Sequence, residues 1–115
     1  MENCRQHPAI LVVEDIAWIR SGMKKAVECC GYHVFEATND TEAFELAEQE
    51  TIDLILTEEE LPMFNALMKR LSEHSTLSSI PVAIINPDAE GARLGDAYLL
   101  ADFADITSLL AVLRH

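Results

Sequence analysis

Short apolar runs alternate with amphipathic segments along the chain, and the period of this pattern predicts the elements. Residues Ala9–Asp15, AILVVED, form a near-continuous apolar run, which is typical of a strand buried on both faces. In residues 16–31 the apolar side chains recur every three or four positions, which predicts a helix with Gly31 as its C-cap. The alternation continues to the C-terminus, with predicted strands at 32–38, 52–58, 80–86 and 98–103 and predicted helices at 39–50, 63–74 and 105–115.

Strands that alternate with helices predict an α/β fold with one parallel sheet covered by helices on both faces. Asn39 or Asp40 is the expected N-cap of the second helix, and Asp105 that of the last. Residues 87–97 contain one proline and two glycines, so they predict at most one or two turns of helix. In such sheets ligands bind beyond the carboxyl ends of the strands, which directs attention to the residues that follow each strand.

Composition narrows the classes of function. The 115 residues predict a single domain, 1–115, and a hydrophobic fraction of 50% excludes a disordered chain. No apolar run reaches the length of a membrane helix and the N-terminus is polar, so a cytoplasmic protein without membrane contact is expected. The net charge of −12 disfavours direct nucleic-acid binding and suits a divalent cation or a basic protein surface. No nucleophile triad or phosphate-binding glycine loop is present, so no enzymatic activity is expected.

Some single residues carry smaller predictions. Cys29 and Cys30 are adjacent and do not fit a disulfide framework or a metal knuckle, so both are expected to be reduced, with at least one in the core. Trp18 is expected to be half-buried packing, with a partner contact as the alternative. The four histidines have no ligand spacing and are expected at the surface.

Carboxylates gather at two predicted strand ends. Glu14 and Asp15 end the first strand, and Glu58 ends the third. If both strands are central, these three groups share one crevice, where their mutual repulsion favours a bound cation. Carboxylate oxygens suit Mg²⁺, so the sequence predicts a magnesium site at Glu14, Asp15 and Glu58. Glu59 and Glu60, which follow, are expected to be ordinary loop acids.

The ordered set ILVVED, IR in the first helix, GYHVFEA, DLILTEEELPMFN, IPVAIIN and YLLADF resembles response-regulator receiver domains (the CheY-like family) over nearly the whole chain. The resemblance implies a flavodoxin-like (βα)5 three-layer sandwich with a five-stranded parallel sheet, and a phosphorylation site used in two-component signalling. The family's metal-binding acid pair falls on Glu14 and Asp15, and its phosphoacceptor aspartate on Glu58.

Three positions depart from the family pattern. Besides the Asp→Glu change at Glu58, the Ser/Thr of the fourth strand falls on Asn86, and the lysine of the fifth falls on Ala101. The aromatic switch position matches Tyr98. A longer carboxylate moves the attacking oxygen by about an ångström, which can cost on the order of 10²-fold in rate. The stretch from Asn86 to Ala101 is also shorter than in the family, so a fourth helix is expected to be shortened or lost and the family's dimer face remodelled.

These features predict a pseudo-receiver that signals through protein–protein contact without phosphorylation, as a fixed interaction module rather than a phosphate mimic. The expected partner is a signalling protein or a component related to histidine kinases, with a second copy of the chain also considered. Two alternatives stay open: a phospho-accepting receiver that uses Glu58 with Mg²⁺, and a sensor of divalent metals or small ligands in the acidic crevice.

Overall fold

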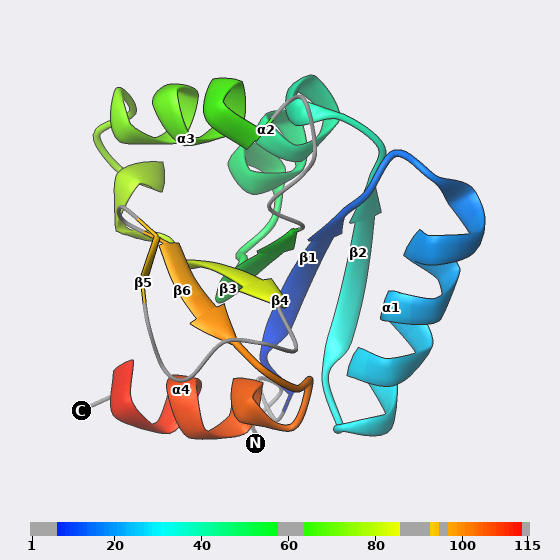
Figure 1. Ribbon diagram of the computed structural model, residues 1–115. Coiled ribbons are helices and arrows are strands. Elements are labelled where there is room, and N and C mark those ends of the chain that lie inside the picture. The colour runs from blue at the N-terminus through cyan, green and yellow to red at the C-terminus, as the bar shows by residue number, and fades with distance from the viewer. Residues whose placement is uncertain (1–6, 58–63, 86–92, 95–96, 114–115) are drawn as a thin grey trace, which may run out of the picture.

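The computed structural model describes residues 7–57, 64–85, 93–94 and 97–113, and it consists of strands alternating with helices (Figure 1). The elements, in chain order, are β1 (Ala9–Val13), α1 (Ala17–Cys29), β2 (His33–Ala37), α2 (Asp40–Gln49), β3 (Leu54–Thr57), α3 (Phe64–Ser72), the 3₁₀ helix η1 (Leu77–Ser79), β4 (Val82–Ile85), β5 (Arg93–Leu94), β6 (Ala97–Leu100) and α4 (Asp105–Leu113).

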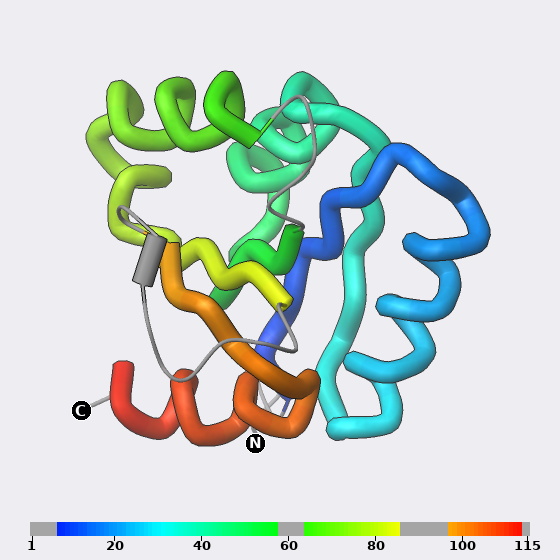
Figure 2. Tube along the Cα trace, in the orientation of Figure 1, coloured from blue at the N-terminus to red at the C-terminus, as the bar shows by residue number. Residues whose placement is uncertain are grey.

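The strands form one sheet in the order β2-β1-β3-β4-β6-β5. Every neighbouring pair is parallel except β5 and β6, which pair antiparallel through two residues each. Figure 2 shows β1 (blue) lying between β2 (cyan) and β3 (green), so the first strand is central although it begins the chain. The predicted five-stranded parallel sheet is confirmed, with β5 as an additional edge strand.

Helices cover both faces of the sheet, as the alternation of the sequence predicts. Figure 1 shows α2 and α3 on one face, while α1 and α4 cover the other. Alternate residues of β1 serve the two layers: Leu11 and Val13 pack toward α2 and α3, and Ile10 and Val12 toward α1 and α4. All five residues of β1 are buried, which explains why its sequence is continuously apolar instead of alternating.

Local sequence sets the ends of the helices. Gly31 follows the C-cap residue Cys30 with φ of 95°, a left-handed conformation that glycine adopts without strain, so the predicted glycine stop of α1 is confirmed. Asn39 is the N-cap of α2, and its side-chain oxygen accepts from the Glu42 backbone N–H at 2.8 Å. Asp105, the predicted N-cap of the last helix, is instead the first residue of α4.

The prediction that Cys29 or Cys30 lies in the core is wrong. Cys29 is exposed and Cys30 is half-buried, and both are free thiols. The buried face of α1 is supplied by Met23 and Val27, so the two cysteines lie at the end of the helix where its contact with the sheet is over.

Between β4 and β6 the structure describes a short strand. Of residues 86–96, the structure describes only 93–94, and these form β5. The expected shortening or loss of a fourth helix concerns residues 86–92 and 95–96, which lie outside the described residues. Among the helices of the described ranges, none combines the length and the apolar character needed to cross a membrane.

Candidate functional site

The candidate site lies at the carboxyl edge of the sheet, where the five parallel strands end together. Glu14 follows β1 and Ala101 follows β6, so the sheet carries both to the same edge. The predicted site residues Glu58 and Asn86, which come after β3 and β4, lie outside the described residues. The geometry of the site is therefore described from Glu14, Asp15, Tyr98 and Ala101 and their surroundings.

Glu14 is fully buried and shapes the turn between β1 and α1. Its backbone N–H donates to the Ala37 carbonyl oxygen at 3.0 Å, which continues the ladder between β1 and β2 by one step. Its Oε2 accepts from the Ile16 backbone N–H at 2.9 Å. A buried carboxylate is costly unless it is hydrogen-bonded, so this bond helps to hold Glu14 inside and fixes the start of the helix.

Arg20 ties α1 to this edge. Its Nη1 donates to the Glu14 carbonyl oxygen at 2.8 Å, and its Nε lies 3.3 Å from Oε1 of Glu36 on β2. The Arg20 side chain is only 18% exposed, so one guanidinium joins the ends of β1 and β2 to the second turn of α1. The sequence prediction did not assign this role, although the Ile19-Arg20 pair belongs to the motif set quoted above.

The predicted metal ligands are brought together only in part. Glu14 is buried and the neighbouring Asp15 is exposed, while Glu58 follows the buried Thr57 and is not described. Within residues 7–57, 64–85, 93–94 and 97–113, no three His, Cys, Asp or Glu side chains are grouped as a metal site. Two adjacent carboxylates suit the oxygen preference of Mg²⁺, so Glu14 and Asp15 fit as part of a ligand set that needs a further contributor.

At the end of β6 the chain has no charged or hydroxyl side chain at position 101. Ala101 is exposed directly after β6, and its methyl group can neither donate a hydrogen bond nor neutralise an anion. Asp102, next in the chain, is used for local structure: its Oδ1 accepts from the Ala104 N–H at 3.1 Å, and its own N–H donates to Asp105 Oδ2 at 3.1 Å. Tyr98 is half-buried and packs with the core cluster beneath α1 and α4.

The prediction that Trp18 is half-buried packing is wrong. Trp18 is 77% exposed in the first turn of α1, and Ile16 just before it is 44% exposed. The buried face of α1 turns Met23 and Val27 toward the sheet, which leaves Trp18 on the outer face. Two large apolar side chains thus lie in water within four residues of Glu14.

The family model of the response regulator receiver domain matches residues 10–101 of this chain. Among relatives, the response regulator receiver protein CpdR of Brucella abortus is 30% identical over 100 residues, which cover 80% of this chain and 82% of CpdR. The transcriptional regulatory protein CrdR of Helicobacter pylori is 33% identical over 93 residues, covering 79% of this chain and 43% of CrdR. The aerobic respiration control protein ArcA of Escherichia coli is 38% identical over 63 residues, covering 55% of this chain and 26% of ArcA. The chain therefore spans less than half of the length of ArcA and CrdR.

Solved structures give the same fold. The receiver domain of the sensor histidine kinase PA1611 from Pseudomonas aeruginosa, which has a magnesium ion in its active-site cleft, matches with a TM-score of 0.74 and 20% identity over 92% of this chain and 96% of that one. CheY4 of Vibrio cholerae matches with a TM-score of 0.69 and 21% identity over 94% and 97% of the two chains. With its doubly wound sheet, its acid pair at the end of β1 and the family match over residues 10–101, this chain belongs to the response regulator receiver domains of two-component signalling.

Proposed function

We propose that this receiver domain signals in the cytoplasm through protein–protein contact and does not accept a phosphoryl group. Three substitutions support the proposal: a glutamate at position 58, an amide at position 86 and an alanine at position 101. The first lengthens the nucleophile, and the other two remove the hydroxyl and the cation that the resemblance leads one to expect around a phosphoryl group. No enzymatic turnover is proposed, and the charge of −12 argues against direct contact with nucleic acid.

The observation that carries the proposal is the outer face of α1. Four exposed residues of α1 are spaced by three or four positions and so form one stripe along the helix: Trp18, Ser21, Gly22 and Lys25. A tryptophan in water beside small residues offers a partner both a large apolar side chain and a place for close backbone approach.

Gly22 supports this interpretation independently. A glycine inside a helix costs about 1 kcal/mol relative to alanine, so its presence calls for a reason. A Cβ atom built at Gly22 would meet nothing within 4 Å, and its φ is not positive. The fold of this chain therefore does not require Gly22, whereas a partner helix lying against α1 would.

The partner best suited to this surface is a helix of another signalling protein, with an apolar recess for Trp18 and basic residues at its margin. The basic margin follows from the charge of −12 and from Asp15, which is exposed beside Trp18. Histidine kinases and the proteins related to them are the family's usual partners, so they are the first candidates to test.

Substitution of Gly22 separates folding from binding. Gly22→Ala is expected to raise the free energy of unfolding by about 1 kcal/mol, because only helix propensity changes. Gly22→Leu should fold equally well but weaken binding to a cognate kinase by about tenfold or more, because its side chain occupies the approach of the partner. Ser108→Leu on the exposed face of α4 is a matched control that leaves this binding unchanged. Equal binding by wild type and Gly22→Leu in calorimetry would remove the α1 surface from the proposal.

Phosphorylation is tested directly by intact-mass measurement after incubation with acetyl phosphate or a phosphorylated kinase and Mg²⁺. We expect no added mass. A gain of one phosphoryl group that disappears in Glu58→Ala would establish instead the phospho-accepting receiver that uses Glu58.

Divalent-metal sensing is the second candidate function, and the buried Glu14 beside the exposed Asp15 favours it. Trp18 lies three residues after Asp15, so its fluorescence should report Mg²⁺ binding there. A saturable change that is lost in Asp15→Asn supports a metal-responsive site, and an unchanged signal across millimolar Mg²⁺ argues against one.

A further inference from the structure

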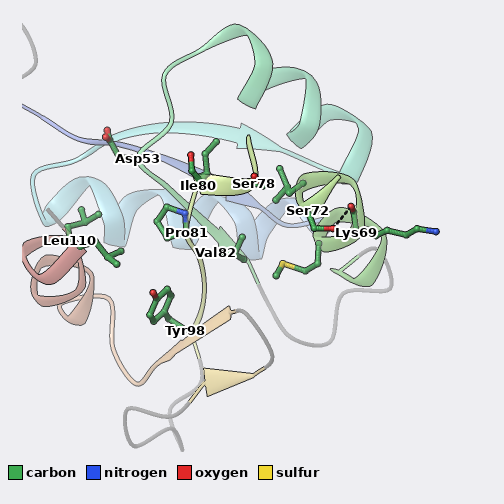
Figure 3. A pocket seen from close by; sticks show the side chains of 13 residues that line it. Asp53, Lys69, Ser72, Ser78, Ile80, Pro81, Val82, Tyr98 and Leu110 are labelled. Atoms are coloured by element: carbon green, nitrogen blue, oxygen red, sulfur yellow. Dashed lines mark hydrogen bonds between the residues drawn. The ribbon is translucent and has the colours of Figure 1, made fainter. Parts of the chain in front are cut away.

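The connection between α3 and β4, residues 73–81, forms part of the wall of two hollows at the amino end of the sheet. Ser78 and Ile80 line a hollow of about 780 Å³, as Figure 3 shows. Thr76 and Leu77 line a second hollow of about 500 Å³, which also reaches the end of α2. A change in the shape of this connection therefore changes both hollows, at the end of the sheet opposite to the acid pair.

His74 holds this connection through one of its ring nitrogens. Its Nδ1 accepts from the backbone N–H of Thr76 at 3.2 Å and from that of Leu77 at 3.1 Å. These N–H groups lie at the start of η1, where the N-cap residue Thr76 makes no side-chain capping bond of its own. An imidazole nitrogen accepts a hydrogen bond only when it carries no proton, so this geometry requires a neutral His74 with its proton on Nε2.

The other edge of the His74 ring faces α2. Nε2 lies 3.7 Å from Oε2 of Glu48, and the ring makes a T-shaped contact with Phe44, with the two ring centres 5.7 Å apart. A separation of 3.7 Å is too long for a hydrogen bond, but it becomes an ion pair once the ring is charged. His74 thus joins two structures, η1 through a bond that needs the neutral ring and α2 through a contact that favours the charged ring.

The charged groups around His74 also favour a positive ring. Glu48 and Glu50 line the same hollow as His74, and Glu73 precedes it in the chain. The guanidinium of Arg70 lies against the aromatic ring that His74 contacts. Three carboxylates therefore stand against one cation in these surroundings, and the His74 side chain is 31% exposed, so water can deliver a proton to it.

We propose that His74 is a pH-sensitive switch that exchanges its hold on η1 for an ion pair with α2. When Nδ1 takes up a proton from water it becomes a donor that faces two backbone donors, so the bonds to Thr76 and Leu77 are lost. The imidazolium is then held by Glu48, which keeps α2 and α3 joined while the start of η1 is released. Histidine is the side chain that ordinarily changes charge between pH 5 and 8, so mild acid is sufficient to change the walls of the two hollows.

NMR spectra of the full chain between pH 8 and pH 5 test the proposal. At pH 8, long-range proton–nitrogen spectra should show the His74 proton on Nε2. As the pH falls, the amide signals of Thr76 and Leu77 should move together with the ring signals of His74. The hydrogen-exchange protection of the Leu77 amide, corrected for the intrinsic effect of pH, should fall by about fivefold, as expected for the loss of one hydrogen bond.

Matched substitutions separate the two contacts of the ring. His74→Gln should abolish the response of the two amides, whereas His33→Gln, at an exposed histidine of β2, should leave it intact. Glu48→Gln should keep the bonds to η1 and move the transition to lower pH, because the charged ring loses its partner. Glu45→Gln, at another exposed position of α2, is the control for that shift.

Three results would overturn the proposal. These are amide signals of Thr76 and Leu77 that stay in place from pH 8 to pH 5, a His74 proton on Nδ1 at pH 8, and a transition that is the same in Glu48→Gln as in wild type. None of them bears on the contact along α1, which is measured with a kinase and with Gly22 variants at one pH.

Discussion

The two halves of the sheet differ in how completely the described chain covers them. On one side, every residue of β1 and β3 is buried, and α1, α2 and α3 pack over these strands. On the other side, Tyr98 and Leu99 of β6 are only half-buried, and the two-residue strand β5 forms the edge. A hollow lined by Asp53, Pro81 and Tyr98 opens at the amino ends of β3 and β4. The first half contains Glu14 and Asp15, and the second contains Ala101.

The two halves also differ in the residues that they carry at the positions of the family's site. The half that keeps its acidic residues is also the half with a complete core, since Glu14 and Arg20 there contribute to folding as well as to any chemistry. The other half carries Ala101 at the position that resembles the family's lysine. On the proposal that no phosphoryl group is accepted, the packing of the second half is not constrained by a bound phosphoryl group.

The largest expected effect comes from shortening one buried leucine side chain and comparing it with a half-buried one in the other half of the sheet. Leu11→Ala in β1 should lower the free energy of unfolding by 2–5 kcal/mol, on the order found for fully buried leucines. Leu99→Ala in β6 should cost about 1 kcal/mol, because its side chain is already half in water. Urea denaturation measures both losses. Equal losses would mean that the β6 side is covered as well as the β1 side, and the comparison would fail.

A smaller effect is expected at the helix caps. Asn39→Ala removes the 2.8 Å bond to the Glu42 N–H at the start of α2 and should cost about 1 kcal/mol. The N-cap of α1, Ile16, makes no side-chain capping bond, so Ile16→Ala is a control that loses no cap. Thermal unfolding of the two variants measures the difference, and a similar shift in both would contradict the capping role of Asn39.

Arg70 should contribute slightly less, because it is partly exposed. Its Nη1 lies 3.3 Å from Asp40 Oδ2 and 3.2 Å from Thr41 Oγ1, and its guanidinium carbon lies 4.6 Å from the centre of the Phe44 ring. Arg70→Ala breaks this link between α2 and α3 and should cost roughly 0.5–1 kcal/mol. Lys69→Ala at the next position should change stability by less than about 0.5 kcal/mol. If the two variants unfold at the same urea concentration, the link between the helices contributes nothing.

The elements of the fold were predictable from sequence because packing imposes a period on each of them. The run AILVV is apolar throughout because both of its faces are covered, and Asn39 and Gly31 mark helix ends through local hydrogen bonding and φ. The two-residue strand β5 carries no such pattern, since two residues are too few to show alternation. Its existence depends on pairing with β6, which is a tertiary property.

Exposure of single residues was harder to predict. The sequence predicts packing for Trp18 and for at least one of Cys29 and Cys30. A helix buries one stripe, however, and Met23 and Val27 fill that stripe in α1. The position of Arg20 in the sequence likewise does not reveal its bond to a backbone carbonyl. Of the predicted site, Glu14 and Asp15 lie where the strand pattern places them, while the placement of Glu58 and Asn86 stays a prediction.

The smallest expected effect concerns pH and the start of α2. Hydrogen bonds from the Thr38 hydroxyl and backbone N–H, at 2.6 and 2.8 Å, lower the pKa of Glu42 below its ordinary value. A carboxyl group whose pKa is lower in the folded than in the unfolded chain stabilises the fold above its unfolded pKa, and this stabilisation disappears as the pH falls through the folded pKa. Wild type should therefore lose this contribution to its stability in acid. The Glu42→Gln variant has no carboxyl group at this position, so it lacks the contribution at every pH. Denaturation midpoints measured from pH 7 down to pH 3 should converge for the two proteins at the acid end. A difference in denaturation midpoint between wild type and Glu42→Gln that stays constant down to the lowest pH would show that the Thr38 bonds do not depend on the charge of Glu42. The start of α2 would then be stabilised by the Asn39 cap without a charge-dependent contribution from Glu42.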